Sequence, residues 1–353
     1  MKRIKLGLLR TARALGGFAL ARRLTGKGVR ILCYHGTWRT EDGFGGDAMF
    51  MNPDTFRRRL ATIRRLGYAV VPLSDAVRGL RGEAVLPPAS VAITIDDGWY
   101  GTYADMLPAL RAHAMPATLY CDSATVQSRQ VVPHVMASWL RRAAVRTGLS
   151  EAGERAYAAA TDIPAPVAER LAGAARFAAA AGIDLGPYVA ARAFGYMLPE
   201  ELHASAAAGL DVQLHTHNHS LRDLSPAAIT AEINANRAAL AEMLPRDAAR
   251  LAHFCYPSGV CSAEAGAVLK GLGVQSATTT EQGIAWPGTN PYLLPRLLDG
   301  EQVTDLEFEA ELSGFADLLR GVKALLRRVK RGERTGASAG AGAAKGHLAG
   351  AAT

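Results

Sequence analysis

Two short segments of this chain hold the residues best suited to chemistry. In the first, Asp96 and Asp97 are adjacent carboxylates that directly follow the apolar run Val91–Ile95. Two neighbouring carboxylates in a mostly apolar setting repel each other, so a cation is expected to hold one of them. Because Asp-Gly is also a common turn dipeptide, Asp97-Gly98 on its own would favour an ordinary turn or loop cap.

The second segment is His215-Thr216-His217-Asn218-His219. Three imidazoles in five residues are improbable as core histidines, because each buried ring would need its own hydrogen-bond partner. Imidazole nitrogen is the commonest protein ligand for zinc and similar ions, and two histidines with one aspartate leave positions open for water and substrate. The pattern predicts a catalytic metal site; a histidine cluster that binds nothing is the alternative.

These residues need a framework of short buried strands to position them. The predicted strands are Val29–Tyr34, Ala69–Val71, Ser90–Ile95, Ala117–Cys121, Leu210–Leu214, His253–Tyr256 and Gln275–Thr279. Helical segments separate several of them, for example the one that begins at Ser225-Pro226 and continues to about Met243. Strands that alternate with helices of this length predict an α/β fold with a parallel barrel.

Composition divides the chain into a central domain and two unlike ends. Residues 1–28 are basic and predicted to form an amphipathic helical segment, and residues 29–319 form the predicted β/α barrel. Within the barrel, an Ala-rich stretch at about 127–195 has no strand candidate, which predicts a helical insertion that either caps the site or buttresses the barrel. Residues 320–353 are basic and then Gly/Ala/Ser-rich, which predicts a disordered tail.

The formal net charge of +8 belongs to the ends of the chain. Residues 1–40 contain ten Lys and Arg and no acid, and residues 320–353 contain eight against Glu333. The stretch between them has 22 basic and 31 acidic residues, which argues against a nucleic-acid partner. Two interpretations of the basic N-terminus stay open: peripheral contact with an anionic membrane, or packing on the domain.

The cysteines and the hydropathy bear on the compartment. Cys33, Cys121 and Cys255 lie in short apolar runs, where a reduced thiol behaves as a small core residue. No uninterrupted apolar run reaches the roughly 18 residues needed to span a bilayer. A secretory signal is disfavoured because arginines interrupt Leu6–Leu24. These features predict a cytoplasmic protein, membrane-associated if the N-terminus binds lipid.

Together, the motifs resemble those of a known family. SVAITIDDG (90–98), HTHNH (215–219) and FCYPSG (254–259) look like the NodB-homology polysaccharide deacetylases, carbohydrate esterase family 4. The resemblance covers roughly residues 30–315 and includes YHG, SATTTEQG and LPRLLD. It implies a distorted parallel β/α barrel with a metal at its mouth. It also implies a metal-dependent hydrolase that removes N-acetyl groups from an amino-sugar saccharide, or from its lipid-linked precursor, and releases acetate.

The resemblance assigns roles residue by residue. Asp96 becomes the general base, which takes a proton from the water that attacks the acetamide carbonyl. Asp97, His215 and His219 become the ligands of one divalent metal, zinc with cobalt or nickel as alternatives. His217 matches no role. The turn Tyr256–Gly259 resembles the family's PYG turn, which places the Ser258 amide where it would stabilise the oxyanion.

Two family residues are replaced in this chain. Cys255 stands where the family has an Arg that orients the base; Arg296 in LPRLLD is expected to supply that charge by pairing with Asp96, a surface ion pair being the alternative. The family's late histidine is absent, since only His347 follows residue 296. His35 is therefore assigned as the general acid, as in a branch with a permuted order that includes exopolysaccharide deacetylases. A capping or core histidine is its rival interpretation.

Other functions remain open at this level. Trp99 and Tyr100 flank the proposed site, where they either line a sugar-binding groove or simply pack in the core. A related barrel amidohydrolase acting on a small cyclic amide or ureide would use the same metal and base, but in a closed pocket. A catalytically inactive carbohydrate-binding relative is suggested by the missing Arg and late His.

Overall fold

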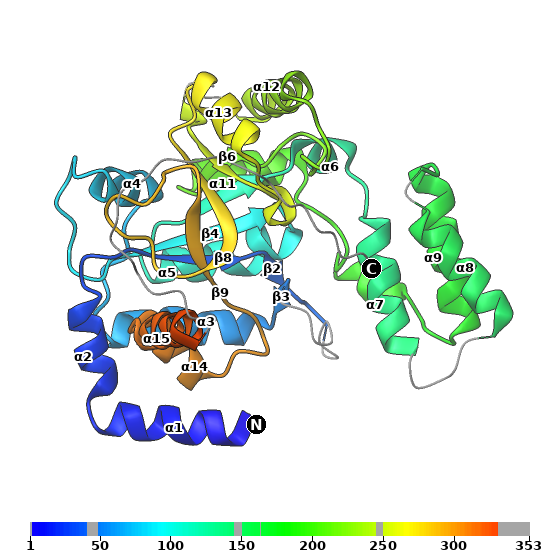
Figure 1. Ribbon diagram of the computed structural model, residues 1–353. Coiled ribbons are helices and arrows are strands. Elements are labelled where there is room, and N and C mark those ends of the chain that lie inside the picture. Colours follow the sequence, from blue (N-terminus) through cyan, green and yellow to red (C-terminus); the bar gives the residue numbers. More distant parts are fainter. Residues whose placement is uncertain (1, 41–48, 145–149, 163, 245–249, 331–353) are drawn as a thin grey trace.

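A closed parallel barrel organises the computed structural model, which describes residues 2–40, 49–144, 150–162, 164–244 and 250–330 (Figure 1). Its strands are β1 Arg30–Tyr34, β4 Val91–Asp97, β5 Thr118–Cys121, β6 Asp211–Leu214, β7 His253–Cys255, β8 Ser276–Gln282 and β9 Leu294–Leu298. They pair in that order, and β9 returns to β1. The α/β barrel class predicted from the sequence is confirmed.

Helices pack around the barrel. Those between strands are α3 Pro53–Arg65, α4 Leu73–Leu80, α5 Leu107–Ala112 after the π-helical turn η1 Thr102–Met106, α6 Ser123–Ser128, α11 Pro199–Ala207, α12 Pro226–Met243 and α13 Ala263–Gly271. Because the strands are covered on both sides, all seven residues of β4 are buried, which accounts for its near-continuous apolar run.

Two strand predictions need correction. Ala69–Val71 forms only an isolated bridge, Val70 to Val91, because Pro72 follows it, has no N–H for a ladder and begins α4. The barrel is instead closed by β9, which was not predicted as a strand. Its second residue is Pro295, and proline within a run argues against a central strand.

The register of the parallel pairs gathers the chemical residues at one end of the barrel. Tyr34 of β1 lies opposite Ile95 of β4, so His35 and Asp96 follow at the same level. Leu214 ends β6 and delivers His215 to the same rim. The carboxyl ends of parallel strands meet at one mouth, where barrel enzymes place their sites.

A helical arm projects beside the barrel, at the right of Figure 1. It comprises α7 Pro133–Ala143, α8 Glu151–Thr161, α9 Val167–Ala180 and α10 Gly186–Ala190. Its base is tied down by the bridge between Val131 and Gly195 and by rings of Trp139, Tyr188 and Phe194 packed together. These helices fall within the insertion predicted at about 127–195.

The two ends of the described chain lie against each other. The N-terminal segment forms α1 Lys2–Ala14 and α2 Gly17–Leu24, and α14 Asp305–Leu312 leads to α15 Phe315–Lys330. The tail predicted to be disordered from residue 320 therefore begins as a helix, because Arg320 pairs with Glu311 and Asp317 and apolar residues recur at helical spacing. Residues 331–353 lie outside the described residues. None of the described helices has the length and apolarity that crossing a bilayer requires.

Candidate active site and metal centre

Asp97, His215 and His219 converge at the mouth of the barrel. Oδ1 of Asp97 lies 3.2 Å from Nε2 of His215 and 3.1 Å from Nε2 of His219. The three ligand atoms lie within 4.8 Å of one another, so the group could hold a metal ion. One carboxylate oxygen and two imidazole nitrogens form a donor set that suits zinc and similar divalent ions and leaves coordination positions open.

The partners of these side chains direct the ligand atoms inward. Nδ1 of His215 lies 2.8 Å from the carbonyl oxygen of Cys255, and this contact turns Nε2 toward Asp97. Trp99 donates from Nε1 to Oδ2 of Asp97 at 2.8 Å, which leaves Oδ1 for the imidazoles. Burial opposes ionisation of Asp97, but hydrogen bonds from His215 and His219 prevail and hold its pKa well below the usual range. Asp97 is therefore a carboxylate.

Helix α12 fixes the histidine segment from behind through Asn236. Its Oδ1 accepts a hydrogen bond from the His215 N–H at 3.0 Å. Its Nδ2 donates to the Cys121 carbonyl and to Ser123 Oγ, at 3.1 and 2.8 Å. A single buried amide thus joins the ends of β5 and β6.

One turn earlier on α12, Glu232 holds the rest of the segment. Its carboxylate accepts hydrogen bonds from the backbone N–H groups of His217 and Asn218, at 3.1 and 3.0 Å. Sequence reasoning predicted this helix but missed Glu232 and Asn236. The available signal was a polar pair four residues apart on one face of an Ala-rich helix.

Asp96 is held by Arg296 in a two-pronged ion pair. Nη1 and Nη2 of Arg296 donate to Oδ1 and Oδ2 of Asp96, each at 2.7 Å, and Nε donates to the Thr279 carbonyl at 2.8 Å. The predicted pairing is present; the alternative of a surface ion pair is wrong, because Arg296 is only 1% exposed. Burial opposes ionisation of Asp96, but the Arg296 charge outweighs it and lowers the pKa of that carboxyl.

Two cysteine thiols complete the surroundings of this ion pair. Sγ of Cys255 lies 3.2 Å from Nη2 of Arg296 and 3.5 Å from Oδ2 of Asp96, and Sγ of Cys33 lies 3.7 Å from the same oxygen. Burial raises the pKa of both thiols more than Arg296 lowers it, so they stay protonated. The short Cys255 side chain leaves room for a guanidinium that arrives from β9.

His35 lies on the open side of Asp96. Its Nε2 is 4.0 Å from Oδ2 of Asp96, and 28% of its side chain is exposed. Its carbonyl accepts a hydrogen bond from Thr102 Oγ1 at 3.1 Å, whereas its Nδ1 has no hydrogen-bond partner among the described residues. The ring is neither a cap nor a fully buried core residue, and its catalytic role stays a prediction.

Four residues around the mouth have left-handed backbone. Their φ values are 77° for Asp97, 67° for Thr216, 53° for His219 and 54° for Ser258. Such conformations cost of order 1–3 kcal/mol each in non-glycine residues and persist only where the surroundings impose them. Ser258 lies in the turn after β7, which places its backbone at the rim; its role toward an oxyanion stays a prediction.

The site opens toward solvent on one side. Its floor of Asp96, Asp97 and His215 is buried, whereas 34% of the His219 side chain is exposed. On α7 of the arm, His134 lies close enough to Asp97 and His219 for their charges to act on it. Burial and the charge of Arg170 lower its pKa.

The two aromatic residues beside the site are both covered by other side chains of the protein. Trp99 is buried between the rings of Phe50 and Tyr196, so it cannot stack on a sugar. Its role is the hydrogen bond to Asp97. Tyr100 is half-buried beneath the guanidinium of Arg192, 3.8 Å from its ring centroid.

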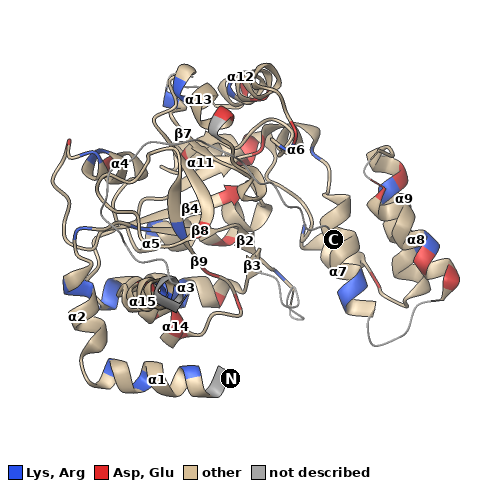
Figure 2. Cartoon of the chain, viewed as in Figure 1, with Lys and Arg blue, Asp and Glu red and all other residues tan. Residues whose placement is uncertain are grey.

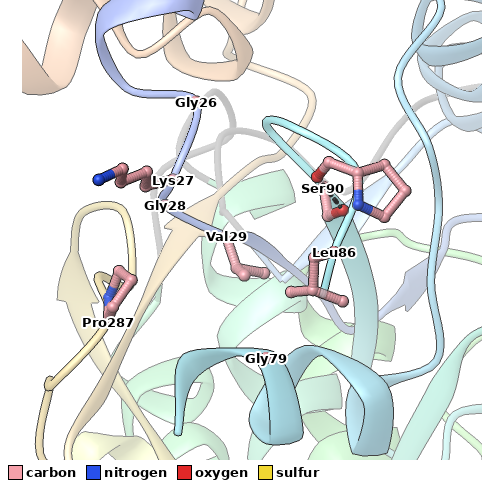
Figure 3. A pocket seen from close by; sticks show the side chains of 9 residues that line it. Gly26, Lys27, Gly28, Val29, Gly79, Leu86, Ser90 and Pro287 are labelled. Atoms are coloured by element: carbon pink, nitrogen blue, oxygen red, sulfur yellow. Dashed lines mark hydrogen bonds between the residues drawn. The ribbon is translucent and has the colours of Figure 1, made fainter. Parts of the chain in front are cut away.

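A separate cavity of about 180 Å³ lies at the opposite end of the barrel (Figure 3). It is lined by residues that precede β1 and β4, among them Gly28, Val29 and Ser90, and by Leu86. The side chain of Lys27 extends away from Leu86 and Ser90 in this view. The lining contains none of the residues of the metal-ligand group or of the Asp96 ion pair, and conserved features at the amino ends of barrel strands serve stability, so this cavity is not the candidate active site.

Comparison with known proteins supports the fold. A family model described as polysaccharide deacetylase matches residues 84–277. The Streptococcus pyogenes deacetylase PplD in complex with acetate is similar, with a TM-score of 0.56, 16% identity and coverage of 81% of this chain and 98% of that chain. IcaB from Ammonifex degensii is similar too, with a TM-score of 0.55, 19% identity and coverage of 82% of this chain and 98% of that chain. No curated protein matches significantly. At such identities the likeness to solved structures shows the fold alone.

We expect replacement of one ligand to abolish tight metal binding. His219→Ala removes one of three ligands and should weaken zinc binding more than roughly 100-fold, beyond what loss of an outer hydrogen bond costs. Isothermal titration of zinc into metal-free protein measures the change. His217→Ala is the matched control, because His217 Nδ1 lies 2.9 Å from Ser123 Oγ and outside the ligand group. Equal affinity of both variants would contradict this assignment.

Proposed function

Because the chain belongs to the polysaccharide deacetylase family, we propose that it removes N-acetyl groups from an amino-sugar saccharide or its lipid-linked precursor and releases acetate. One divalent metal ion would assist, zinc with cobalt or nickel as alternatives. One observation carries the proposal: an ionised Asp96, fixed by Arg296, adjoins the group formed by Asp97, His215 and His219. A proton acceptor beside a metal-ligand group is what hydrolysis of an amide requires.

The metal would be held by Asp97, His215 and His219. When bound, such an ion lowers the pKa of water and polarises a carbonyl oxygen. The protein prepares the site before an ion arrives, since Trp99 and the Cys255 carbonyl already orient two of the three ligands.

Asp96 serves as the acceptor of the proton of the attacking water. A carboxylate has about four lone-pair positions, and the two hydrogen bonds from Arg296 occupy one on each oxygen. The thiols of Cys33 and Cys255 also approach Oδ2, so the lone pair left on Oδ1 is the freest, and the plane of the carboxylate is fixed. The charge of Arg296 keeps Asp96 ionised despite its burial.

His35 serves as the donor of a proton to the departing amine. Its Nε2 lies 4.0 Å from Oδ2 of Asp96, so the acid His35 and the base Asp96 can act on the same amide bond from neighbouring positions. The Ser258 amide, at the turn after β7, would add a hydrogen bond to the oxyanion.

Two features weigh against the rival functions. Arg296 and His35 stand near Asp96 in place of the family residues that the chain lacks, so an inactive carbohydrate-binding relative is not favoured. The exposure of His35 and His219 favours a bulky saccharide over the closed pocket that a small cyclic amide would need.

Removing the base should stop hydrolysis without removing the metal. We expect Asp96→Asn to slow acetate release from the best substrate of an N-acetylated oligosaccharide panel by about 10²–10⁴-fold, while zinc content is unchanged. Asp75→Asn, on the exposed surface of α4, is the control and should keep full activity. Retained activity of Asp96→Asn would remove Asp96 from its role.

Removing the orienting cation should shift the pH profile. In Arg296→Met the largest influence that opposes the burial of Asp96 is lost, so its pKa rises and the acid limb of kcat/KM moves upward by at least about one pH unit. Arg296→Lys, which keeps the charge, should shift it less, and Arg78→Met on the surface should not shift it. Circular dichroism verifies that each variant folds. An unmoved acid limb in Arg296→Met would contradict this coupling.

A role of His35 as acid can be separated from a structural one by the leaving group. We expect His35→Ala to slow deacetylation of the amide substrate about 10²-fold or more and to leave hydrolysis of 4-nitrophenyl acetate nearly unchanged, because nitrophenolate departs without a proton. His203→Ala, an exposed histidine on α11, should affect neither reaction. Equal losses on both substrates would assign His35 to the structure of the site.

A further inference from the structure

The N-terminal helices and α15 form one surface with an unusual residue pattern. Helix α1 packs against α2 and α14, and α15 packs against the same two helices. We propose that this surface binds the face of an anionic lipid bilayer. The inference goes beyond the proposed function and does not depend on it.

Helix α1 is fixed to the domain by one of its sides. Leu9 is buried in a cluster with Phe18 and Ala310. Lys5 and Arg13 form ion pairs at 2.7 and 3.1 Å with Glu307 and Glu309 of α14. The apolar and charged groups on the inner side of α1 therefore have partners on the domain, and this packing fixes the direction in which the outer side of the helix faces.

The outer side of α1 and α2 is apolar and exposed. On α1, Ile4 and Leu8 lie one turn apart and are 71% and 67% exposed, and Leu15, directly after the helix, is 82% exposed. On α2, Leu20 and Leu24, one turn apart, are 58% and 62% exposed. Packing on the domain explains the inner side of this segment and leaves these five leucine and isoleucine side chains in water.

Helix α15 adds a second exposed apolar row. Its members, all at least 37% exposed, are Leu318, Leu319, Val322, Leu325 and Leu326. Together with Ile4, Leu8, Leu15, Leu20 and Leu24 and the cations Arg10, Arg23 and Lys323, they define what we call the basic apolar face.

The charge of this face selects the partner. Figure 2 shows Lys and Arg along α1 and α2 and no acidic residue on either helix. Arg10 and Arg23 are exposed and make no ion pair with a described residue. Exposed aliphatic side chains among unpaired cations match an anionic bilayer surface, which offers both an apolar layer and negative headgroups. A second copy of the chain would bring like charges together, which disfavours self-association through this face.

Vesicle flotation tests the proposal. We expect the full chain to float with phosphatidylcholine vesicles that contain phosphatidylglycerol, and not with phosphatidylcholine alone. Arg10→Gln with Arg23→Gln should weaken binding roughly 30-fold, and added salt should weaken wild-type binding too. Leu8→Gln with Leu15→Gln should weaken it at least about tenfold. Val189→Gln is the matched control: Val189 is 60% exposed on the distant helix α10.

Each other outcome overturns the proposal. Wild-type protein that stays with the soluble fraction, or that floats equally with neutral vesicles, excludes an anionic bilayer as the partner. Equal binding of the leucine variant and wild type excludes this face. Sedimentation that shows a dimer lost in Leu8→Gln with Leu15→Gln would assign the face to a second copy. Zinc binding of these variants should be unchanged, so this test is independent of the proposed activity.

Discussion

The ion pair between Asp96 and Arg296 is the constraint on which the site depends. A carboxylate buried among apolar strands stays ionised only if a cation with good geometry accompanies it. The cation comes from β9, 200 residues further along the chain, so the base is complete only when the barrel closes. The neutral thiols of Cys33 and Cys255 fill the remaining space without adding charge.

The same reasoning explains how two adjacent aspartates coexist. Asp96 faces a guanidinium, whereas Asp97 turns to Trp99, His215 and His219 through a left-handed backbone step. Each carboxylate has its own partners, which removes the repulsion that their neighbouring positions would otherwise cause. The two aspartates can therefore act differently: Asp96 can accept a proton, while Asp97 can bind a cation.

Much of this arrangement could be predicted from the sequence, because local patterns carry it. The run ending in Asp96-Asp97 and the histidine segment marked strand ends, and parallel strand ends share one mouth. Features set by distant packing were harder. Pro295 argued against a strand at β9, and Asn236 and Glu232 act across the helix–barrel interface. Trp99 is packed between Phe50 and Tyr196 and donates to Asp97, which its sequence position does not reveal. Helix α15 continues past residue 320, where Arg320 pairs with Glu311 and Asp317, and composition does not reveal these pairs.

The left-handed residues at the mouth have a consequence for how the molecule divides its stability. Asp97, Thr216, His219 and Ser258 each sit in an unfavourable backbone region, and the strands and α12 hold them there. Relaxing any of the four would remove backbone strain, but it would also shift a residue at the rim of the site. At this rim, fold stability and the precise placement of the site residues are opposed. The stability of the barrel compensates for the backbone strain and so permits that placement.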